Sequence, residues 1–283
     1  YYPPPALLSS YKILLLLFNH SKMSSTGAGY DFSPTTYSTD GRIYQVEYAS
    51  KAVENRGTAL GLNCKDGVVL VVEKPLVSKM LVPGSNRRIH NVGTNAGIAL
   101  AGLLADGRQI INRARDECRS YKDSYDVAIP PNVLSERLSQ YVHYFTLHGS
   151  LRPFGAAALI ASVDPDNAAQ GGALHMIEPS GISYRYFGCA VGKGRQGAKT
   201  EIEKLKLQDL SCREGLKEAA KILHTLHDGS KDKPFIMEAS WLCQETGWKH
   251  QAVPADLITE ADQWGKKAVE DADMDDDSDE EAK

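Results

Sequence analysis

The sequence predicts an α+β fold: a four-layer α/β/β/α sandwich of two antiparallel sheets. Predicted strands arrive in adjacent runs, which favours antiparallel hairpins. Predicted helices arrive in pairs, and a helix pair can cover the outer face of a sheet. The run GVVLVVE at 67–73 is almost wholly apolar, which indicates a strand covered on both faces. A doubly wound parallel sheet would need strands and helices that alternate strictly, and the pattern lacks that order.

The first predicted elements come after a turn at Asp40-Gly41. A helix is expected after this turn because apolar residues recur there at helical spacing. These residues are Ile43, Val46, Ala49 and Val53. Two strands then come at 58–64 and from 67 onward, and the tight turn Lys65-Asp66 joins them as a hairpin.

The later elements continue this order of hairpins and helix pairs. Further strands are expected at 89–92, 96–103, 155–163, 173–177, 182–190 and 235–242. Helices are expected at 105–120, from Pro130 onward, at 195–207, at 211–227 and after Pro254. Ser211 and Glu214 have the spacing of a capping box, in which each side chain satisfies a free N–H at the helix start.

Composition limits the class of protein. The chain has 283 residues, 42% hydrophobic and 24% charged, which suits a globular protein with one sizeable core. No basic stripe interleaved with aromatic residues appears, so nucleic acid is not an expected partner. The five cysteines form no C-x-x-C pair, which favours reduced thiols in the cytoplasm or nucleus. We expect no metal and no cofactor.

The first 22 residues differ in character from the rest of the chain. Their apolar run, 13–18, is far shorter than the roughly 20 residues that cross a membrane. A secretory signal is the alternative, but no small-x-small cleavage site comes after the run. The chain starts with Tyr1, and Met23 is a better initiator. We therefore expect residues 1–22 to be a leader outside the native protein, and no membrane association.

The segment AVGKGRQGAKT at 190–200 contains G-x-G-x-x-G. A dinucleotide site would need this motif inside a βαβ unit, whereas here it lies between a hairpin strand and a helix pair. A phosphate loop would need Lys directly after the last glycine, and Ala198 intervenes. The alternative to nucleotide binding is that the glycines let a helix start press on the sheet.

Residues 30–74 closely resemble the opening of 20S proteasome α-type subunits. The core of the resemblance is S-x-D-G-R-x-x-Q-V-E-Y-A at Ser38–Ala49, and it continues in GLLADGRQIINRAR, YVHYFTLHGSLRPFG and GKGRQGAKTEIEKL. The resemblance implies the N-terminal nucleophile hydrolase fold in a non-catalytic form. It divides the chain into a gate tail at 23–42, the α-type domain at 43–268 and an acidic tail at 269–283, which we expect to be disordered.

In catalytic members of this family, a threonine at the chain start is the nucleophile and its own amine helps as base. The resemblance places Gly57 at that position, after a complete helix. Glu73 and Arg88 take the places of the acid and the activating lysine, and an arginine keeps its proton at neutral pH. Lys193, Lys231 and Asp228 occupy the other matching positions. We therefore expect no peptidase activity; the competing hypothesis is a self-processing hydrolase cleaved before Thr58.

The resemblance implies a structural role instead. Seven α subunits would form each outer ring, against an inner ring of β subunits that carries the active sites. The helix from Ile43, with Val46, Tyr48 and Ala49, would pack between ring neighbours; an ordinary core helix is the alternative. The gate tail would include Gly27, Gly29, Tyr30 and Asp31. Phe32 stands where the family often has arginine, which leaves this subunit's part in the gate's ion pairs open.

The resemblance carries two further expectations. Arg88 matches a pocket that binds the C-terminal carboxylates of regulatory particles such as 19S, although Arg87-Arg88 could equally be a solvated surface pair. Ser278 precedes Asp279, Glu280 and Glu281, a context that suits a kinase of the casein kinase 2 type; an unmodified solubilising tail is the alternative. The expected location is the cytoplasm and nucleus.

Overall fold

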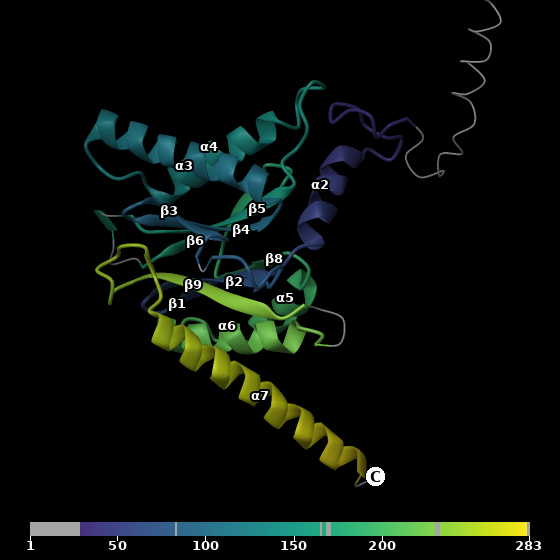
Figure 1. Cartoon of the computed structure of the whole chain (residues 1–283). Coiled ribbons are helices and arrows are strands. Elements are labelled where there is room, and N and C mark those ends of the chain that lie inside the picture. The colour runs from purple at the N-terminus through teal and green to yellow at the C-terminus, as the bar shows by residue number, and fades with distance from the viewer. Residues whose placement is uncertain (1–28, 83, 165, 168–170, 230–232, 282–283) are drawn as a thin grey trace, which may run out of the picture.

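The computed structural model describes residues 29–281 apart from 83, 165, 168–170 and 230–232, and for 272–281 it describes the backbone alone. Its described part is a four-layer sandwich, as predicted (Figure 1). One pair of helices covers the outer face of one sheet, and the three helices of the C-terminal third lie on the other sheet. Residues 1–28, which include the predicted leader and Gly27, lie outside the described residues.

In chain order, the helices are α2 (Tyr44–Glu54), α3 (Leu104–Tyr125), α4 (Pro131–Tyr144), α5 (Arg195–Lys204), α6 (Cys212–Leu226) and α7 (Ala255–Glu281). The first sheet holds β1 (Ala59–Cys64), β2 (Gly67–Pro75), β8 (Gly188–Val191), β9 (Phe235–Cys243) and β10 (Gln251–Ala252). The second sheet holds β3 (Ile89–Gly93), β4 (Ala96–Gly102), β5 (Ala156–Ser162), β6 (Ala173–Ile177) and β7 (Ser183–Tyr186).

Both sheets are antiparallel throughout. The strand order is β10-β9-β2-β1-β8 in the first sheet and β3-β4-β5-β6-β7 in the second. The predicted hairpin is present, with Cys64 opposite Gly67 across the turn at Lys65-Asp66. The run from Val68 to Val72 is buried on alternate sides by two different apolar clusters, which explains why it shows no polar alternation.

Two predicted boundaries are wrong. The sequence predicts one strand over 182–190, but the chain forms β7 in the second sheet and then β8 in the first. It changes sheets at Phe187, and a continuous run of strand-forming residues gives no local signal for such a crossing. Helix α3 runs to Tyr125 rather than to 120, and it ends where Asp126 turns left-handed at φ 59°.

The acidic tail also differs from the prediction. Helix α7 continues to Glu281, so most of the segment expected to be disordered is helical. The first half of α7 packs on α6, and Gly265 permits a close approach to Ala220. This packing stabilises the first half of the helix. It does not explain the helix over the acidic residues, which repel one another and lie unfavourably at a helix C-terminus.

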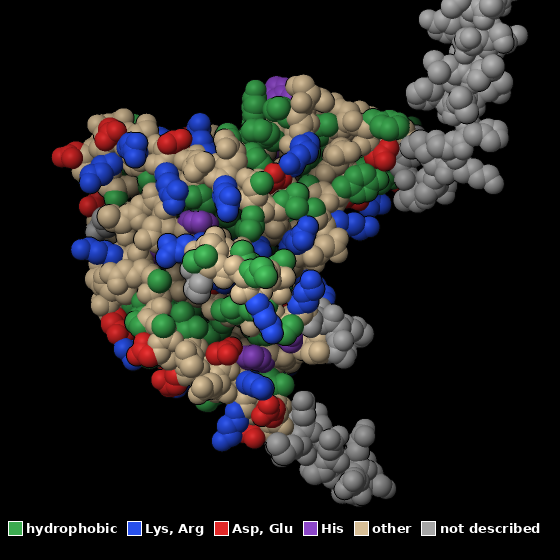
Figure 2. All heavy atoms as spheres, in the orientation of Figure 1, with side chains coloured by type: hydrophobic (Ala, Val, Ile, Leu, Met, Phe, Trp, Pro, Cys, Tyr) green, Lys and Arg blue, Asp and Glu red, His purple; other side chains and the backbone are tan. Residues whose placement is uncertain are grey.

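The predicted capping box is confirmed. The capping box of Ser211 and Glu214 has both of its hydrogen bonds. All five cysteines are free. Among the described residues, no helix combines the length and apolarity needed to span a bilayer. Figure 2 shows Lys and Arg side chains spread over the visible face rather than gathered into one stripe.

Candidate functional site

Gly57, the position expected for a nucleophile, lies within the chain between helix α2 and strand β1. Helix α2 leads through Asn55 and Arg56 to Gly57, and β1 begins two residues later. The nitrogen of Gly57 is therefore an amide and cannot act as a free amine. A Cβ atom on Gly57 would lie 2.6 Å from the main-chain oxygen of Glu73. Any side chain at this point, a threonine included, would have to displace the main chain of Glu73.

The polar groups around Gly57 are occupied by the main chain. The N–H of Thr58 donates to Oε2 of Glu73 at 2.9 Å, and Oγ1 of Thr58 accepts from the N–H of Gly194 at 3.0 Å. Nδ1 of His227 lies 3.6 Å from Oε1 of Glu73. Thr58 is only 2% exposed. These bonds hold the start of β1 in place and leave no hydroxyl directed at a substrate.

The glycine motif packs against this same segment. A Cβ atom on Gly192 would lie 2.5 Å from the main-chain oxygen of Gly57, and Gly192 has a left-handed φ of 101°. Gly194 lies against Thr58 and Leu226. The loop therefore lacks the open cradle that phosphate binding needs. Its glycines permit close packing, which was the alternative to nucleotide binding. Of the other matching positions, Lys231 lies outside the described residues.

Arg88 lies at the start of β3, beside the first sheet. Its own N–H and that of Ile89 donate to the Glu238 carboxylate at 3.0 and 3.3 Å, and Nζ of Lys74 lies 3.2 Å from the same carboxylate. The pKa of the Arg88 guanidinium lies below its ordinary value, mainly because the group is partly buried. The nearby Glu238 carboxylate offsets part of this shift, and the charge of Arg56 adds to it. Nε of Arg88 is buried and has no hydrogen-bond partner among the described residues. Arg87, in contrast, is exposed.

The described part of the gate tail folds back on its own helix. The amide of Gln45 donates to the main-chain oxygen of Asp31, and the hydroxyl of Tyr48 lies 3.5 Å from Oδ2 of Asp31. Oδ1 of Asp31 is buried without a partner among the described residues. Tyr30 is exposed, Phe32 is 74% exposed, and Gly29 has a left-handed φ of 86°. Asp31, one of the predicted gate residues, thus meets α2 of the same chain.

Helix α2 has one face on its own sandwich and other faces outward. Ala49 and Val53 are buried, whereas Val46 is half-buried and Tyr48 is exposed. Ile43 precedes the helix as its N-cap. In Figure 1, α2 stands at one end of the sandwich, apart from the helix layers. Its position and its outward aromatic residues are compatible with the predicted contact to a neighbour.

A family comparison fits this arrangement. The family model described as "Proteasome subunit" matches residues 53–242. The chain belongs to the proteasome subunit family. A second model, which describes the N-terminal signature of the A-type proteasome subunits, matches residues 30–52, which cover the tail and most of α2. The resemblance drawn from the sequence motif is confirmed.

Curated relatives agree with the family models. The chain is 56% identical over 253 residues to "Proteasome subunit alpha type-3" of Arabidopsis thaliana, covering 89% of this chain and 100% of that protein. It is 57% identical over 246 residues to "Proteasome subunit alpha type-3" of Acanthamoeba castellanii, covering 87% and 96%. It is 45% identical over 251 residues to "Probable proteasome subunit alpha type-7" of Saccharomyces cerevisiae, covering 87% and 86%.

As a proteasome subunit of the α type, the chain is a structural, non-catalytic part of the 20S core particle. The geometry around Gly57 gives the physical reason. A proteasome nucleophile must be a free N-terminal threonine, and here a helix, an amide bond and a side-chain clash occupy its place. The predicted absence of a catalytic residue therefore rests on packing as well as on family.

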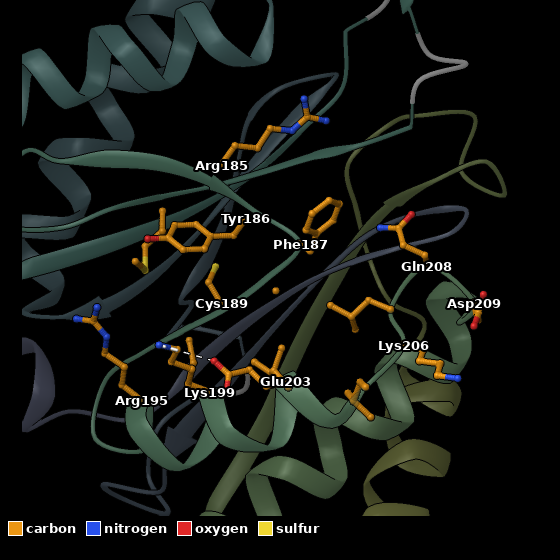
Figure 3. Close-up of a pocket in the computed structure, with 16 residues that line it drawn as sticks. Arg185, Tyr186, Phe187, Cys189, Arg195, Lys199, Glu203, Lys206, Gln208 and Asp209 are labelled. Atoms are coloured by element: carbon orange, nitrogen blue, oxygen red, sulfur yellow. Dashed lines mark ion pairs between the residues drawn. The ribbon is translucent and has the colours of Figure 1, made fainter.

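One surface cavity of this proteasome subunit had no signal in the sequence. It measures about 710 Å³ and opens between the edge strands β7 and β8 and helix α5. In Figure 3, Tyr186 and Phe187 lie on one side, and the Lys199–Glu203 ion pair lies on the helix. Burial raises the pKa of the Cys189 thiol at its floor. The crossing of the chain from one sheet to the other creates this cavity, so local sequence could not predict it.

Within the described residues, no group of three or more His, Cys, Asp or Glu side chains is arranged to hold a metal ion. Ser278 lies on the part of α7 for which only the backbone is described.

Proposed function

We propose that this α-type subunit assembles with ring neighbours through α2, contributes its N-terminal tail to the substrate gate, and helps to dock regulatory particles near Arg88. The observation that carries the structural role is the sealed Gly57 position, where a Cβ atom would lie 2.6 Å from the Glu73 oxygen. The purified chain is expected to keep its full intact mass and to hydrolyse no fluorogenic peptide. Cleavage before Thr58 together with peptide hydrolysis would instead support the self-processing hydrolase.

The gate role is supported by the tail's attachment to α2. Asp31 contacts Gln45 and Tyr48, while Tyr30 and Phe32 remain exposed and available to other tails. In a core particle assembled with this subunit, Asp31→Ala is expected to raise basal peptide hydrolysis, because the tail loses the carboxylate that contacts Tyr48 and keeps only the main-chain bond to Gln45. Thr35→Ala, in the same exposed segment, serves as the control. Unchanged basal hydrolysis with Asp31→Ala would contradict a role of this tail in the gate.

The docking role is supported by the half-buried position of Arg88, which leaves the residue partly accessible. A guanidinium pairs with a carboxylate through charge-assisted hydrogen bonds. Arg88→Ala is expected to weaken activation by C-terminal peptides of a regulatory particle, and the exposed neighbour Arg87→Ala is the matched control. Equal effects of the two substitutions would support the alternative, in which Arg87 and Arg88 are a solvated surface pair without a specific docking role.

The remaining parts of the proposal concern partners and modification. The subunit would contact β subunits of the adjacent ring and act in the cytoplasm and nucleus, as proposed from its reduced cysteines and its family. Ser278 would be a substrate of an acidophilic kinase, because acidic residues come directly after it. Phosphopeptide mapping of the native protein tests this, and an unmodified Ser278 in cells would contradict it.

A further inference from the structure

A second cavity, of about 620 Å³, lies between the C-terminal half of α3, the end of β3 and the segment that leads into β10. It is separate from the Gly57 segment and from Arg88, and its lining residues lie at 91–95, 115–129 and 249–251. Its volume is typical of pockets that hold small ligands, which span about 300–1,000 Å³.

The cavity is lined by four cations and by no acid. Arg115, Arg119 and Lys122 follow one another at i, i+4 and i+7 on one face of α3. Lys249 lies on the wall contributed by the segment before β10. The cationic groups of two different segments therefore border the same hollow.

These four cations have no acidic partner within the described part of the chain. Asp116 and Asp123 lie at helical spacing from Arg119, yet no ion pair joins them to it. On the same helix, Arg113 does pair with Glu117. The side chains bordering the cavity thus differ from the usual solvated helix face, on which opposite charges pair.

The backbone on both sides of the cavity departs from regular geometry. Strand β3 has a bulge between Asn91 and Gly93, and the Asn91 oxygen accepts from Nε of Arg115 at 3.1 Å. Gly247 and Trp248 are both left-handed, with φ of 61° and 59°, directly before Lys249. A bulge redirects side chains at functional sites, and a left-handed aromatic residue is strained. Of the cations at the rim, Arg115 is held by its bond to the bulged strand.

We propose that this cavity binds a small, multiply phosphorylated anion. Two guanidinium groups can each pair with two phosphate oxygens, and two ammonium groups add compact positive charge. No Phe, Tyr or Trp side chain lines the cavity, and its one imidazole, that of His250, is only 4% exposed, so the cavity offers little stacking surface for a nucleotide base. The ligand class is therefore a compact polyphosphate. This inference does not depend on the role in the gate or in docking.

The test uses the full chain and sodium tripolyphosphate in isothermal titration calorimetry at low and at physiological salt. Saturable one-site binding is expected. The double substitution Arg119→Ala with Lys122→Ala should weaken it by at least about tenfold, and Lys249→Ala, from the other wall, should weaken it severalfold. Arg108→Ala is the matched control, since Arg108 is exposed on α3 and does not line the cavity.

Several outcomes would overturn the proposal. They are absence of saturable binding to the wild-type chain, equal loss of affinity in the Arg108→Ala control, and equal affinity for tricarballylate, which presents carboxylates instead of phosphates. Tighter binding of a hexaglutamate peptide would assign the surface to an acidic protein segment instead. Circular dichroism of each variant confirms that the fold is retained, because all substituted side chains are exposed.

Discussion

Two polar clusters in this molecule each have half of what a hydrolase needs. The cluster at Gly57 lies where the sequence resemblance places the family's active site, but it has no nucleophile. The other cluster has a nucleophile and a base: Oγ of Ser240 lies 2.8 Å from Nε2 of His250, and Nδ1 of His250 lies 2.5 Å from Oδ1 of Asn91. This second arrangement has the connectivity of a catalytic triad.

The difference between the clusters lies in access. Ser240 is 2% exposed and His250 is 4% exposed, so no substrate reaches the hydroxyl. The cluster joins β9 of one sheet to β3 of the other, and Gly97 leaves room for the imidazole because a Cβ there would overlap it. We interpret it as a buried link between the sheets. Hydrogen-bond geometry alone does not identify a catalyst.

The largest expected effect comes from breaking this link. His250→Ala removes one buried and one partly buried hydrogen bond, leaves the Ser240 hydroxyl and Oδ1 of Asn91 without their partner, and opens a cavity. We expect a loss of about 3–5 kcal/mol in the free energy of unfolding, measured by urea denaturation. His148→Ala, at an exposed position, should cost less than about 1 kcal/mol. Similar losses for both substitutions would show that the link contributes little.

Acid should destabilise the fold through this link and through a second buried histidine, His175. Burial lowers the pKa of His250 to about 4, and burial with Arg185 lowers that of His175 to about 4. The unfolded histidines titrate near 6.5, so between these values the unfolded chain binds more protons and stability falls as the pH drops. The loss at pH 4 is on the order of 3 kcal/mol per histidine. Urea midpoints from pH 7 to 4.5 measure it, and His250→Gln should flatten the curve.

The Gly57 cluster is expected to be sensitive to added volume rather than to charge. Gly57→Ala places a methyl group against the Glu73 main chain and should cost about 1–3 kcal/mol through overpacking. Gly229→Ala is the control, since a Cβ there would meet nothing within 4 Å. If Gly57→Ala unfolds at the wild-type urea midpoint, the site is less tightly packed than this geometry implies.

A smaller effect is expected at Thr58. Thr58→Val keeps the shape and removes the hydroxyl that accepts from Gly194, which should cost about 1–2 kcal/mol. Thr225→Val tests the same exchange at an exposed position of α6. Thermal unfolding of the two variants gives the comparison, and a larger effect at Thr225 would contradict it.

The last prediction is that the Ser240 hydroxyl does not react with a serine-directed probe. A fluorophosphonate probe, which labels reactive serines, should leave Ser240 of the folded chain unmodified, because the hydroxyl is buried. Mass spectrometry measures the label. Labelling that disappears in Ser240→Ala would show that the cluster opens and would restore a catalytic hypothesis.

The sequence predicted the layers better than it predicted the polar clusters. Apolar periodicity and adjacent hairpins report on burial, which local sequence encodes. The motif around Gly57 also identified the empty nucleophile position. By contrast, Asn91, Ser240 and His250 come from distant segments, and nothing within a short window links them. The change of sheet at Phe187 was missed for the same reason, since strand pairing depends on distant partners.

That change of sheet has a consequence for the isolated subunit. Strands β7 and β8 are each the last strand of their sheet, so two rows of main-chain N–H and C=O groups end on the same flank of the described chain. Edge strands of this kind can pair with a strand of another chain and so promote association. In the purified subunit, these edge strands therefore leave backbone hydrogen-bonding groups open to other copies of the chain, in addition to exposed apolar side chains. We expect self-association to start at this flank.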